Sequence, residues 1–356
     1  MQNVTTIVQD DYTARVDGTA GPEHTVHRQS VCCAERYDTA YLRRVPKVVV
    51  DADFGCGNPT KYLRRGDRVL DIGCGAGMNC YIAAQIVGPE GEVIGVDFTP
   101  AMLAVARGAQ EAFRAEVPDT APLHFIAASA SDLALDIEWA DARLAANPPQ
   151  NQKSLQEHLA AIAGQRRQAP AIADASIDAV ISNCVINLLD DLDKPSVFRE
   201  IARVLKPGGR FAISDNVSNI PVPDTVKADR VLWSACYAGV LQEQEFYAQL
   251  EKAGLVNIRI EVRNPDPALT VENLIFYSIT VTGEKAAAPS AAAGASALYR
   301  GPFKAVLGES GKMYRRGVVE AIAAADQIIL ADPEAAGFLL SDAAQTPALA
   351  SSKCCG

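Results

Sequence analysis

Positive charge is the scarcer kind in this sequence. Lysine and arginine number 33 against 43 aspartates and glutamates, which gives a net charge of −10. Binding to nucleic-acid phosphates needs a basic face, and an anionic membrane surface makes the same demand. No apolar run approaches the roughly 20 residues that a helix needs to cross a bilayer. We therefore expect neither nucleic acid nor a membrane as a partner.

A secretory signal and a zinc motif are also missing. The first 18 residues have no apolar core and carry three early acids, Asp10, Asp11 and Asp17, so we predict a cytoplasmic protein. The nine cysteines are odd in number and include no CxxC pair, which argues against a tetrahedral zinc site. In the cytoplasm their thiols are expected to be reduced.

Short apolar segments alternate with helical patterns through the middle of the chain. Alternation of this kind favours a mostly parallel sheet covered by helices on both faces. The sequence therefore predicts an α/β fold. The expected strands are 68–72, 92–97, 123–126, 177–181 and 210–214, and the expected helices are 78–87, 193–205 and 242–253.

Composition divides the chain into a main domain and four lesser parts. Within the main domain, residues 133–172 are helical in composition and too long for a simple connection, which predicts an inserted helical hairpin. An Ala-, Gly- and Ser-rich stretch indicates a linker. The expected parts are a loose leader (1–30), the main domain (31–282), the linker (283–297), a small C-terminal module (298–346) and a flexible tail with Cys-Cys-Gly (347–356).

The strongest motif is VLDIGCGAG at 69–77, which joins a predicted strand to a predicted helix. Glycine lets the backbone approach a ligand closely, and the helix N-terminus offers free N–H groups. Asp71 precedes the glycines, where a carboxylate would repel a pyrophosphate and suit a positively charged amino group. Asp97 ends the next strand, where it is placed to hydrogen-bond ribose hydroxyls. A glycine-rich turn with two surface acids is the alternative, and the strand–turn–helix context disfavours it.

Residues 67–215 resemble the class I S-adenosylmethionine methyltransferase domain. The resemblance is carried by the glycine motif, by ASASD at 128–132 and by LKPGGR at 205–210. It implies a Rossmann-like sheet covered by helices, S-adenosylmethionine as the cofactor, and an enzyme that transfers its methyl group. The cofactor contacts that it implies are Asp71, Gly73, Gly75, Gly77, Asp97, Ser129, Ala130 and Asn183.

Three cysteines lie in contexts that resemble the arsenite methyltransferase family. They are Cys56 in FGCG, Cys184 in SNCVINL and Cys236 in LWSACYAG. Ligands bind beyond the carboxyl ends of parallel strands, so Cys184 is expected at the mouth of the cofactor cleft. The resemblance covers most of residues 31–282 and implies that the three thiolates bind trivalent arsenic.

Trivalent arsenic suits a site of this composition. It is a soft, thiophilic centre, and three thiolates would leave a lone pair free to attack the sulfonium methyl. The attack requires no general base because arsenic has no proton to lose. The resemblance also implies an upstream cysteine that forms a disulfide with a site cysteine during turnover, and we assign Cys32 or Cys33 to that role.

The predicted partners follow from this chemistry. Arsenite or its thiol conjugates would be the substrate, in arsenic detoxification or in organoarsenical biosynthesis. A thiol reductant such as thioredoxin or glutathione would restore oxidised cysteines. We expect the protein to be a monomer.

Two other functions are compatible with the sequence. A methyltransferase for a small organic acceptor would ordinarily need a base or a shaped aromatic pocket, and none of the four histidines is placed as a base. A non-catalytic arsenic-binding protein would not need the set of Asp71, glycine loop and Asp97. Thiol dependence separates the first alternative from arsenite methylation, and cofactor binding separates the second.

Overall fold

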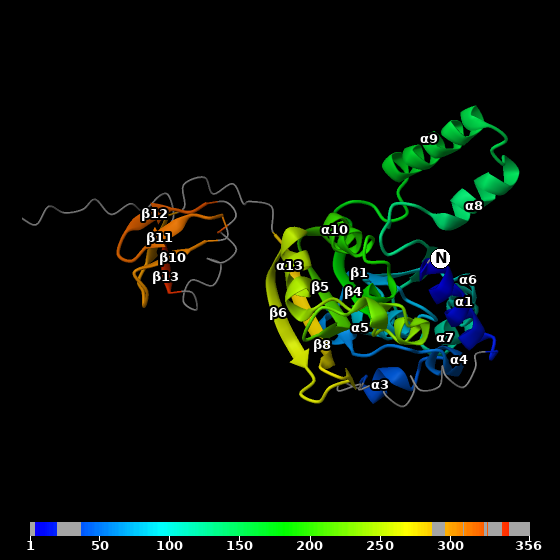
Figure 1. Cartoon of the computed structure of the whole chain (residues 1–356), viewed down its shortest axis with the longest axis horizontal. Coiled ribbons are helices and arrows are strands. Elements are labelled where there is room, and N and C mark those ends of the chain that lie inside the picture. Colours follow the sequence, from blue (N-terminus) through cyan, green and yellow to red (C-terminus); the bar gives the residue numbers. More distant parts are fainter. Residues whose placement is uncertain are drawn as a thin grey trace, which may run out of the picture. The chain divides into compact units, whose positions relative to one another are not determined.

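The computed structural model describes residues 4–19, 37–286, 296–308, 310–323, 326 and 337–341. The chain forms two compact units, Met1–Lys285 and Ala286–Gly356 (Figure 1). Within the described ranges, no helix combines the length and the hydrophobicity that a bilayer crossing requires.

An eight-stranded sheet forms the centre of the first unit. Its strand order is β3-β2-β1-β4-β5-β8-β6, and β7 pairs with β8. The first five strands run parallel, and β8 lies antiparallel between β5 and β6. The predicted α/β fold is confirmed. The strands are β1 (Arg68–Ile72), β2 (Glu92–Asp97), β3 (Leu123–Ala127), β4 (Ile177–Asn183), β5 (Leu205–Ser218), β6 (Leu255–Arg263), β7 (Leu269–Val271) and β8 (Leu274–Lys285).

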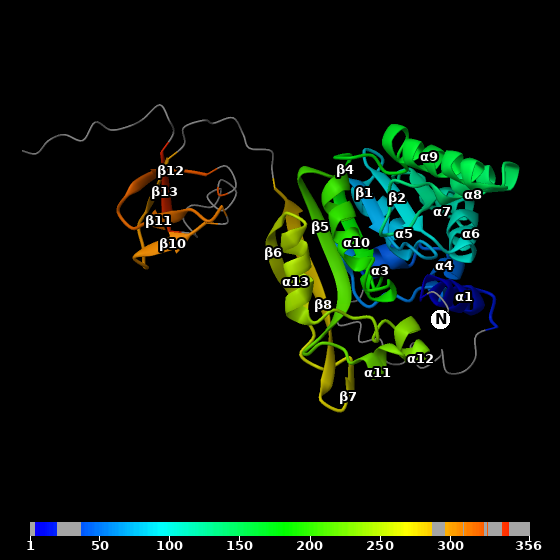
Figure 2. The same ribbon diagram turned by 45° about the horizontal axis from the view of Figure 1, so that its top comes forward.

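Helices cover both faces of this sheet because its parallel strands are apolar on both faces. Alternate residues of β1, such as Val69 and Leu70, are buried in two different core clusters. Side chains of α5, α6 and α7 join the first cluster, and those of α10 and α13 join the second (Figure 2). The helices are α3 (Thr39–Leu42), α4 (Lys47–Asp51), α5 (Met78–Val87), α6 (Pro100–Gly108), α7 (Gln110–Glu116), α10 (Lys194–Val204), α11 (Asp224–Lys227), α12 (Arg230–Ser234) and α13 (Glu243–Lys252), with 3-10 turns η2 (Pro59–Tyr62) and η3 (Ile186–Leu188).

The N-terminal leader differs from the loose segment that the sequence predicted. Residues Val4–Val16 form helix α1, which packs against α6, α12 and η3. Val8 is buried there in a cluster with Trp233 and Ala238. The apolar residues of α1 do not gather on one face, so the sequence lacks the periodicity that reveals a packed helix. Tertiary contacts made by a few side chains hold it instead.

The predicted insertion contains two helices, α8 (Ile137–Ala146) and α9 (Gln152–Gln168). They lie side by side and extend away from the sheet (Figure 1). Asn151 begins α9 with a capping box, in which its side chain accepts a hydrogen bond from the N3 backbone. Arg166 returns to the base of the hairpin and pairs with Asp132 at 2.6 Å.

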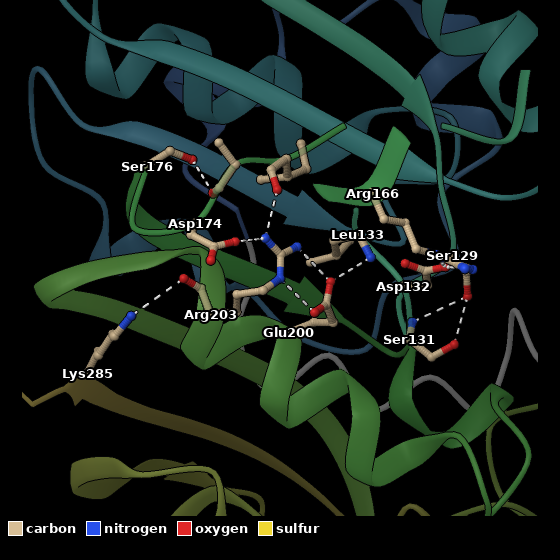
Figure 3. Close-up of polar contacts among 12 residues, drawn as sticks. Ser129, Ser131, Asp132, Leu133, Arg166, Asp174, Ser176, Glu200, Arg203 and Lys285 are labelled. Carbon is tan, nitrogen blue, oxygen red and sulfur yellow. Dashed lines mark hydrogen bonds and ion pairs between the residues drawn. The ribbon is translucent and has the colours of Figure 1, made fainter. Parts of the chain in front are cut away.

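A partly buried guanidinium, that of Arg203, connects the base of this hairpin to α10 (Figure 3). Arg203 donates to the carbonyl of Ile172 at 2.9 Å, and it pairs with Asp174 at 2.6 Å and Glu200 at 2.7 Å. Glu200 in turn accepts a hydrogen bond from the backbone of Leu133 at 2.7 Å. Both ends of the insertion are therefore anchored to one helix.

The second unit is small and built from short strands. A three-stranded sheet has the order β12-β9-β13, and β10 pairs with β11. Tyr299, Tyr314 and Phe338 form most of its core, and the Asp326 carboxylate accepts a hydrogen bond from the Tyr314 hydroxyl at 2.6 Å. The strands are β9 (Ser296–Tyr299), β10 (Ala305–Leu307), β11 (Met313–Arg315), β12 (Val319–Ala321) and β13 (Phe338–Ser341).

We expect Arg203→Met to lower the free energy of unfolding of the first unit by about 2 kcal/mol, because two acids at the hairpin base lose their partner. Urea denaturation followed by circular dichroism measures the change. Arg199→Met is the matched control, since Arg199 is exposed on the same helix. Equal effects of the two substitutions would contradict the anchoring role.

Candidate functional site

A cleft opens beyond the carboxyl ends of β1 to β4. Its empty space is about 1010 Å³, part of which is open to solvent, and this size suits an organic ligand. Gly73 and Gly75 line it with left-handed backbones, at φ 67° and 53°. A Cβ atom on Gly73 would lie 2.4 Å from the Val185 side chain. The loop can therefore adopt this position only with glycine there.

Asp97 ends β2 on the wall of the cleft. One carboxylate oxygen accepts a hydrogen bond from the Gly75 amide at 2.9 Å, and the other accepts one from Thr99 at 2.8 Å. Burial raises the pKa of Asp97, and these backbone donors oppose the increase. The carboxylate thus holds the glycine loop while facing the cleft.

A second acid, Asp53, lies on the cleft wall and was missed by the sequence analysis. It accepts a hydrogen bond from the Gly55 amide at 3.2 Å, and burial raises its pKa. Asp193 also lines the cleft, whereas no lysine, arginine or histidine is among the described residues that do so. The cleft therefore favours a ligand that carries positive charge.

Two predicted cofactor contacts lie outside the cleft lining, namely Asp71 and Gly77. The Asp71 side chain is fully buried and accepts a hydrogen bond from the Cys80 thiol at 3.2 Å. Burial raises the pKa of Asp71 to about 7. Gly77 begins α5, next to the rings of Phe125 and Tyr81. The sequence could not reveal the position of Asp71 because it does not show which way the side chain of a strand residue points.

The remaining predicted contacts do line the cleft, but Asn183 has another use. Its side-chain oxygen accepts hydrogen bonds from the amides of Cys56 at 2.9 Å and Gly57 at 3.0 Å. Its side-chain nitrogen donates to the Gly57 carbonyl at 2.8 Å and to the Tyr37 hydroxyl at 3.1 Å. These four bonds use the whole capacity of the amide, so Asn183 holds the Cys56 loop and has no position left for a cofactor. The predicted residues on the cleft wall are Gly73, Gly75, Asp97, Ser129, Ala130 and Asn183.

The three predicted site cysteines lie together in one buried cluster with Leu188. Cys184 also lines the cleft, and the Cys236 thiol donates to the Cys184 carbonyl at 3.5 Å. Cys56 and Cys184 are joined by a disulfide. The expectation of reduced thiols is therefore wrong for this pair, whose Cα atoms lie 5.8 Å apart, a separation that a disulfide can bridge. Cys32, assigned to disulfide exchange, lies outside the described residues, as do Cys33, Cys354 and Cys355.

Two of these cysteines have an unusual backbone. Cys184 has φ 57° and Cys236 has φ 63°, the left-handed region that residues with a side chain rarely adopt. Such a conformation costs on the order of 1 kcal/mol and is found most often at functional sites. At the end of β4 it turns the chain sharply, so that Cys184 faces both the cleft and Cys236.

Asp215 supports the same turn from β5. Its carboxylate accepts hydrogen bonds from the Ile186 amide at 3.0 Å and the Asn187 side chain at 2.6 Å. Burial raises its pKa to about 7. A carboxylate oxygen of Asp215 and the sulfur atoms of Cys56 and Cys184 lie within 4.8 Å of one another. A buried carboxyl group therefore lies directly beside the cysteines.

Helix α1 covers part of the cleft, and the sequence contained no signal for this. Thr5, Val8 and Tyr12 are on the cleft wall. The Tyr12 hydroxyl lies 4.0 Å from the Cys236 sulfur, which links the helix to the cysteine cluster.

Comparison with known proteins agrees with this geometry. A protein family described as "Methyltransferase domain" matches residues 63–144 and 135–254. The arsenite methyltransferase of Halobacterium salinarum is 35% identical over 240 residues, which is 64% of this chain and 50% of that protein. The arsenite methyltransferase of Aquipseudomonas alcaligenes is 33% identical over 263 residues, covering 71% and 65%. The chain thus aligns with half to just under two thirds of these relatives' lengths.

A solved structure is similar as well. It is an arsenic (III) S-adenosylmethionine methyltransferase from Chlamydomonas reinhardtii, with 28% sequence identity and a TM-score of 0.52. The similarity covers 85% of this chain and 94% of that one. The predicted methyltransferase domain is confirmed, and the chain is similar to arsenite methyltransferases, as its cysteine motifs indicated.

We expect Cys56 and Cys184 to react with iodoacetamide in the unfolded protein only after reduction, because they form a disulfide. Peptide mass spectrometry after unfolding, with and without prior reductant, measures the labelling. The free thiol of Cys80 is the internal control and should be labelled in both samples. Labelling of Cys56 without reductant, with Cys184 protected, would instead show that Cys184 pairs with another cysteine.

Proposed function

Because the chain belongs to the methyltransferase domain family, whose cofactor is S-adenosylmethionine, we propose that it transfers the methyl group of that cofactor to trivalent arsenic. The observation that carries the proposal is the buried cluster of Cys56, Cys184 and Cys236 at the edge of the cleft. Three thiolates at one point are the natural ligand set for a soft, thiophilic centre.

The cleft fits the cofactor in shape and in charge. When bound, S-adenosylmethionine supplies an electrophilic methyl group on a positively charged sulfur, and it also carries an ammonium group. Gly73 and Gly75 leave room for close approach to the backbone, and Asp97 ends β2 where ribose hydroxyls would be recognised. Asp53 faces the same cleft, and no lysine, arginine or histidine is among the described residues of the cleft wall. We assign Asp53 to the ammonium group, the role that the sequence analysis gave to Asp71.

The cysteines position arsenic as the substrate. Cys184 faces the cleft, whereas Cys56 and Cys236 lie behind it, so arsenic held by all three would present its lone pair toward the cofactor. In the transfer, the arsenic lone pair forms the bond to the methyl carbon while the bond from that carbon to sulfur breaks. No proton moves, so no general base is needed. The chain's contribution is orientation and the exclusion of water.

The disulfide makes the site dependent on a reductant. Cys56 and Cys184 cannot bind arsenic while they are joined to each other. Reduction by two external thiols supplies two electrons and two protons, frees both cysteines and leaves the reductant as a disulfide. We propose a small thiol or a dithiol protein such as thioredoxin for this step.

Purified protein supplied with arsenite, S-adenosylmethionine and excess thiol should form methylated arsenicals, which a mass-resolved assay separates and identifies. Cys184→Ser should lower their formation by about 100-fold or more, because the thiolate that faces the cofactor is lost. Cofactor binding by the same variant, measured by calorimetry, is the control and should be retained.

The opposite result has a clear meaning. If the wild-type protein binds the cofactor but leaves arsenite unmethylated in the presence of thiol, arsenic is not the acceptor. The same cleft would then serve a small organic acceptor.

Asp53→Asn should weaken S-adenosylmethionine binding about 10-fold or more, because the ammonium group loses the negative charge that faces it in the cleft. Isothermal titration calorimetry measures the dissociation constant. Asp51→Asn is the matched control, since it removes the same charge from an exposed residue nearby. Equal affinities for wild type and Asp53→Asn would mean that a group other than Asp53 binds the ammonium.

A further inference from the structure

The Cys56–Cys184 disulfide is buried, although the proposed function requires its reduction. Cys184 is 4% exposed and Cys56 is 7% exposed. A dithiol protein carries its reactive sulfur on its own folded surface, so it attacks disulfides that are exposed on the surface of its substrate. A reductant that reaches this disulfide in the folded protein must therefore be small.

One side of the disulfide faces the cofactor cleft. Cys184 lines that cleft, whereas Cys56 is not on its wall. The Cys56 sulfur lies 3.7 Å from the Ser214 carbonyl oxygen on β5, and the Ser278 hydroxyl on β8 donates to the Cys56 carbonyl at 3.4 Å. Two strands of the sheet thus contact Cys56. The path that the described residues leave open leads through the cleft to Cys184.

The wall of this path carries charge of one sign. Asp53, Asp97 and Asp193 line the cleft, and no lysine, arginine or histidine is among the described residues that do so. Backbone amides donate to Asp53 and Asp97, which favours their charged forms. A cleft lined by one sign of charge attracts small ions of the opposite sign and repels those of the same sign. A thiol that carries a carboxylate is therefore disfavoured on the way to Cys184, and one that carries an ammonium group is favoured.

We propose that a small thiol, cationic rather than anionic, reduces the disulfide from within the cofactor cleft, and that Asp53, Asp97 and Asp193 determine this preference. The need for reduction rests on the proposed function, whereas the path and the charge preference concern the disulfide and the cleft alone. Because the thiol and the cofactor use one cleft, reduction must come before the cofactor binds.

The reduction takes two thiol molecules. The thiolate of the first attacks the Cys184 sulfur, a mixed disulfide forms there, and the bond to Cys56 breaks. Cys56 leaves as a thiolate and takes up the proton that the first thiol lost. A second thiolate attacks the outer sulfur of the mixed disulfide and frees Cys184, which takes up the second proton. The two thiols supply two electrons and leave as their own disulfide.

The test compares three thiols of similar size on the oxidised full-length protein: cysteamine, mercaptoethanol and mercaptoacetate. Acid-quenched samples are alkylated, and peptide mass spectrometry measures the appearance of free Cys56 and Cys184. Each rate is divided by the rate for the same disulfide in the linked peptides that trypsin releases from the unfolded protein, which removes the intrinsic reactivity of each thiol. This ratio should be about 10-fold or more higher for cysteamine than for mercaptoacetate, with mercaptoethanol between them. The difference should shrink in about 1 M salt.

Asp193→Asn tests the origin of the preference. It removes one of the three charges and should lower the preference for cysteamine over mercaptoacetate about twofold or more. Asp224→Asn is the matched control, because Asp224 is also exposed but does not line the cleft. An equal preference in wild type and Asp193→Asn overturns the assignment to the cleft wall.

S-adenosylhomocysteine, the cofactor without its methyl group, tests the path. At ten times its dissociation constant it should slow reduction by mercaptoethanol about 10-fold, because most molecules then have a filled cleft. Thioredoxin tests the size limit. Its ratio of rates should be on the order of 100-fold below that of mercaptoethanol, because its attack has to wait for local opening of the fold.

The outcomes separate this proposal from the proposed function. A thioredoxin ratio equal to that of mercaptoethanol overturns the proposal, and so does a preference for mercaptoacetate. Reduction at an unchanged rate, with S-adenosylhomocysteine shown by calorimetry to be bound, also overturns it. If the reduced protein binds the cofactor but leaves arsenite unmethylated, the arsenic function fails, and the expected size and charge preferences still support the small thiol.

Discussion

The side-chain amide of Asn183 holds the candidate acceptor site together. It joins the end of β4 to the FGCG loop, 127 residues earlier in the sequence, through hydrogen bonds to both Cys56 and Gly57. A Cβ atom on Gly55 would lie 2.4 Å from that amide, and one on Gly57 would lie 2.6 Å from Ser214. Two glycines thus allow the loop to come close enough for its cysteine to reach Cys184. The position of Cys56 depends on this clamp.

Several features of the cysteine cluster cost folding free energy. Two of its residues have left-handed backbones, and the sulfur atoms are removed from water beside the buried carboxyl group of Asp215. Local hydrogen bonds offset these costs. Asp215 accepts hydrogen bonds from backbone and side-chain donors of the η3 turn, and the Cys236 carbonyl accepts hydrogen bonds from the side chains of Asn187 and Asn216. Polar groups that are buried with their partners specify one arrangement. Arsenic binding by three sulfur atoms, as proposed, requires one such arrangement because the three atoms must converge on one point.

Charge separates the two halves of the site. The cofactor cleft has three acids on its wall, Asp53, Asp97 and Asp193, and no basic residue among the described ones, which suits a sulfonium and an ammonium group. The acceptor half adds Asp215, and Arg15 from α1 is close enough to Cys236 to lower the pKa of its thiol. Helix α1 covers the cleft with Val8 and Tyr12, and it places an ion pair, Arg15 and Asp11, close to Cys236. Desolvation strengthens the attraction within this pair because water no longer screens it.

Local patterns in the sequence were sufficient for the five parallel strands and the glycine loop, and they singled out three cysteines that the fold brings together. Strand–helix alternation, glycines that need left-handed backbones, and residues at strand ends are properties of short segments, and they led to Gly73, Asp97 and Cys184 directly. The sequence also indicated the family, because these segments carry its motifs. Tertiary structure alone decided that Asp71 points away from the cleft, that Asn183 serves the Cys56 loop, and that Cys56 pairs with Cys184. Those outcomes depend on side-chain direction and on contacts between segments more than 100 residues apart, which no local pattern encodes.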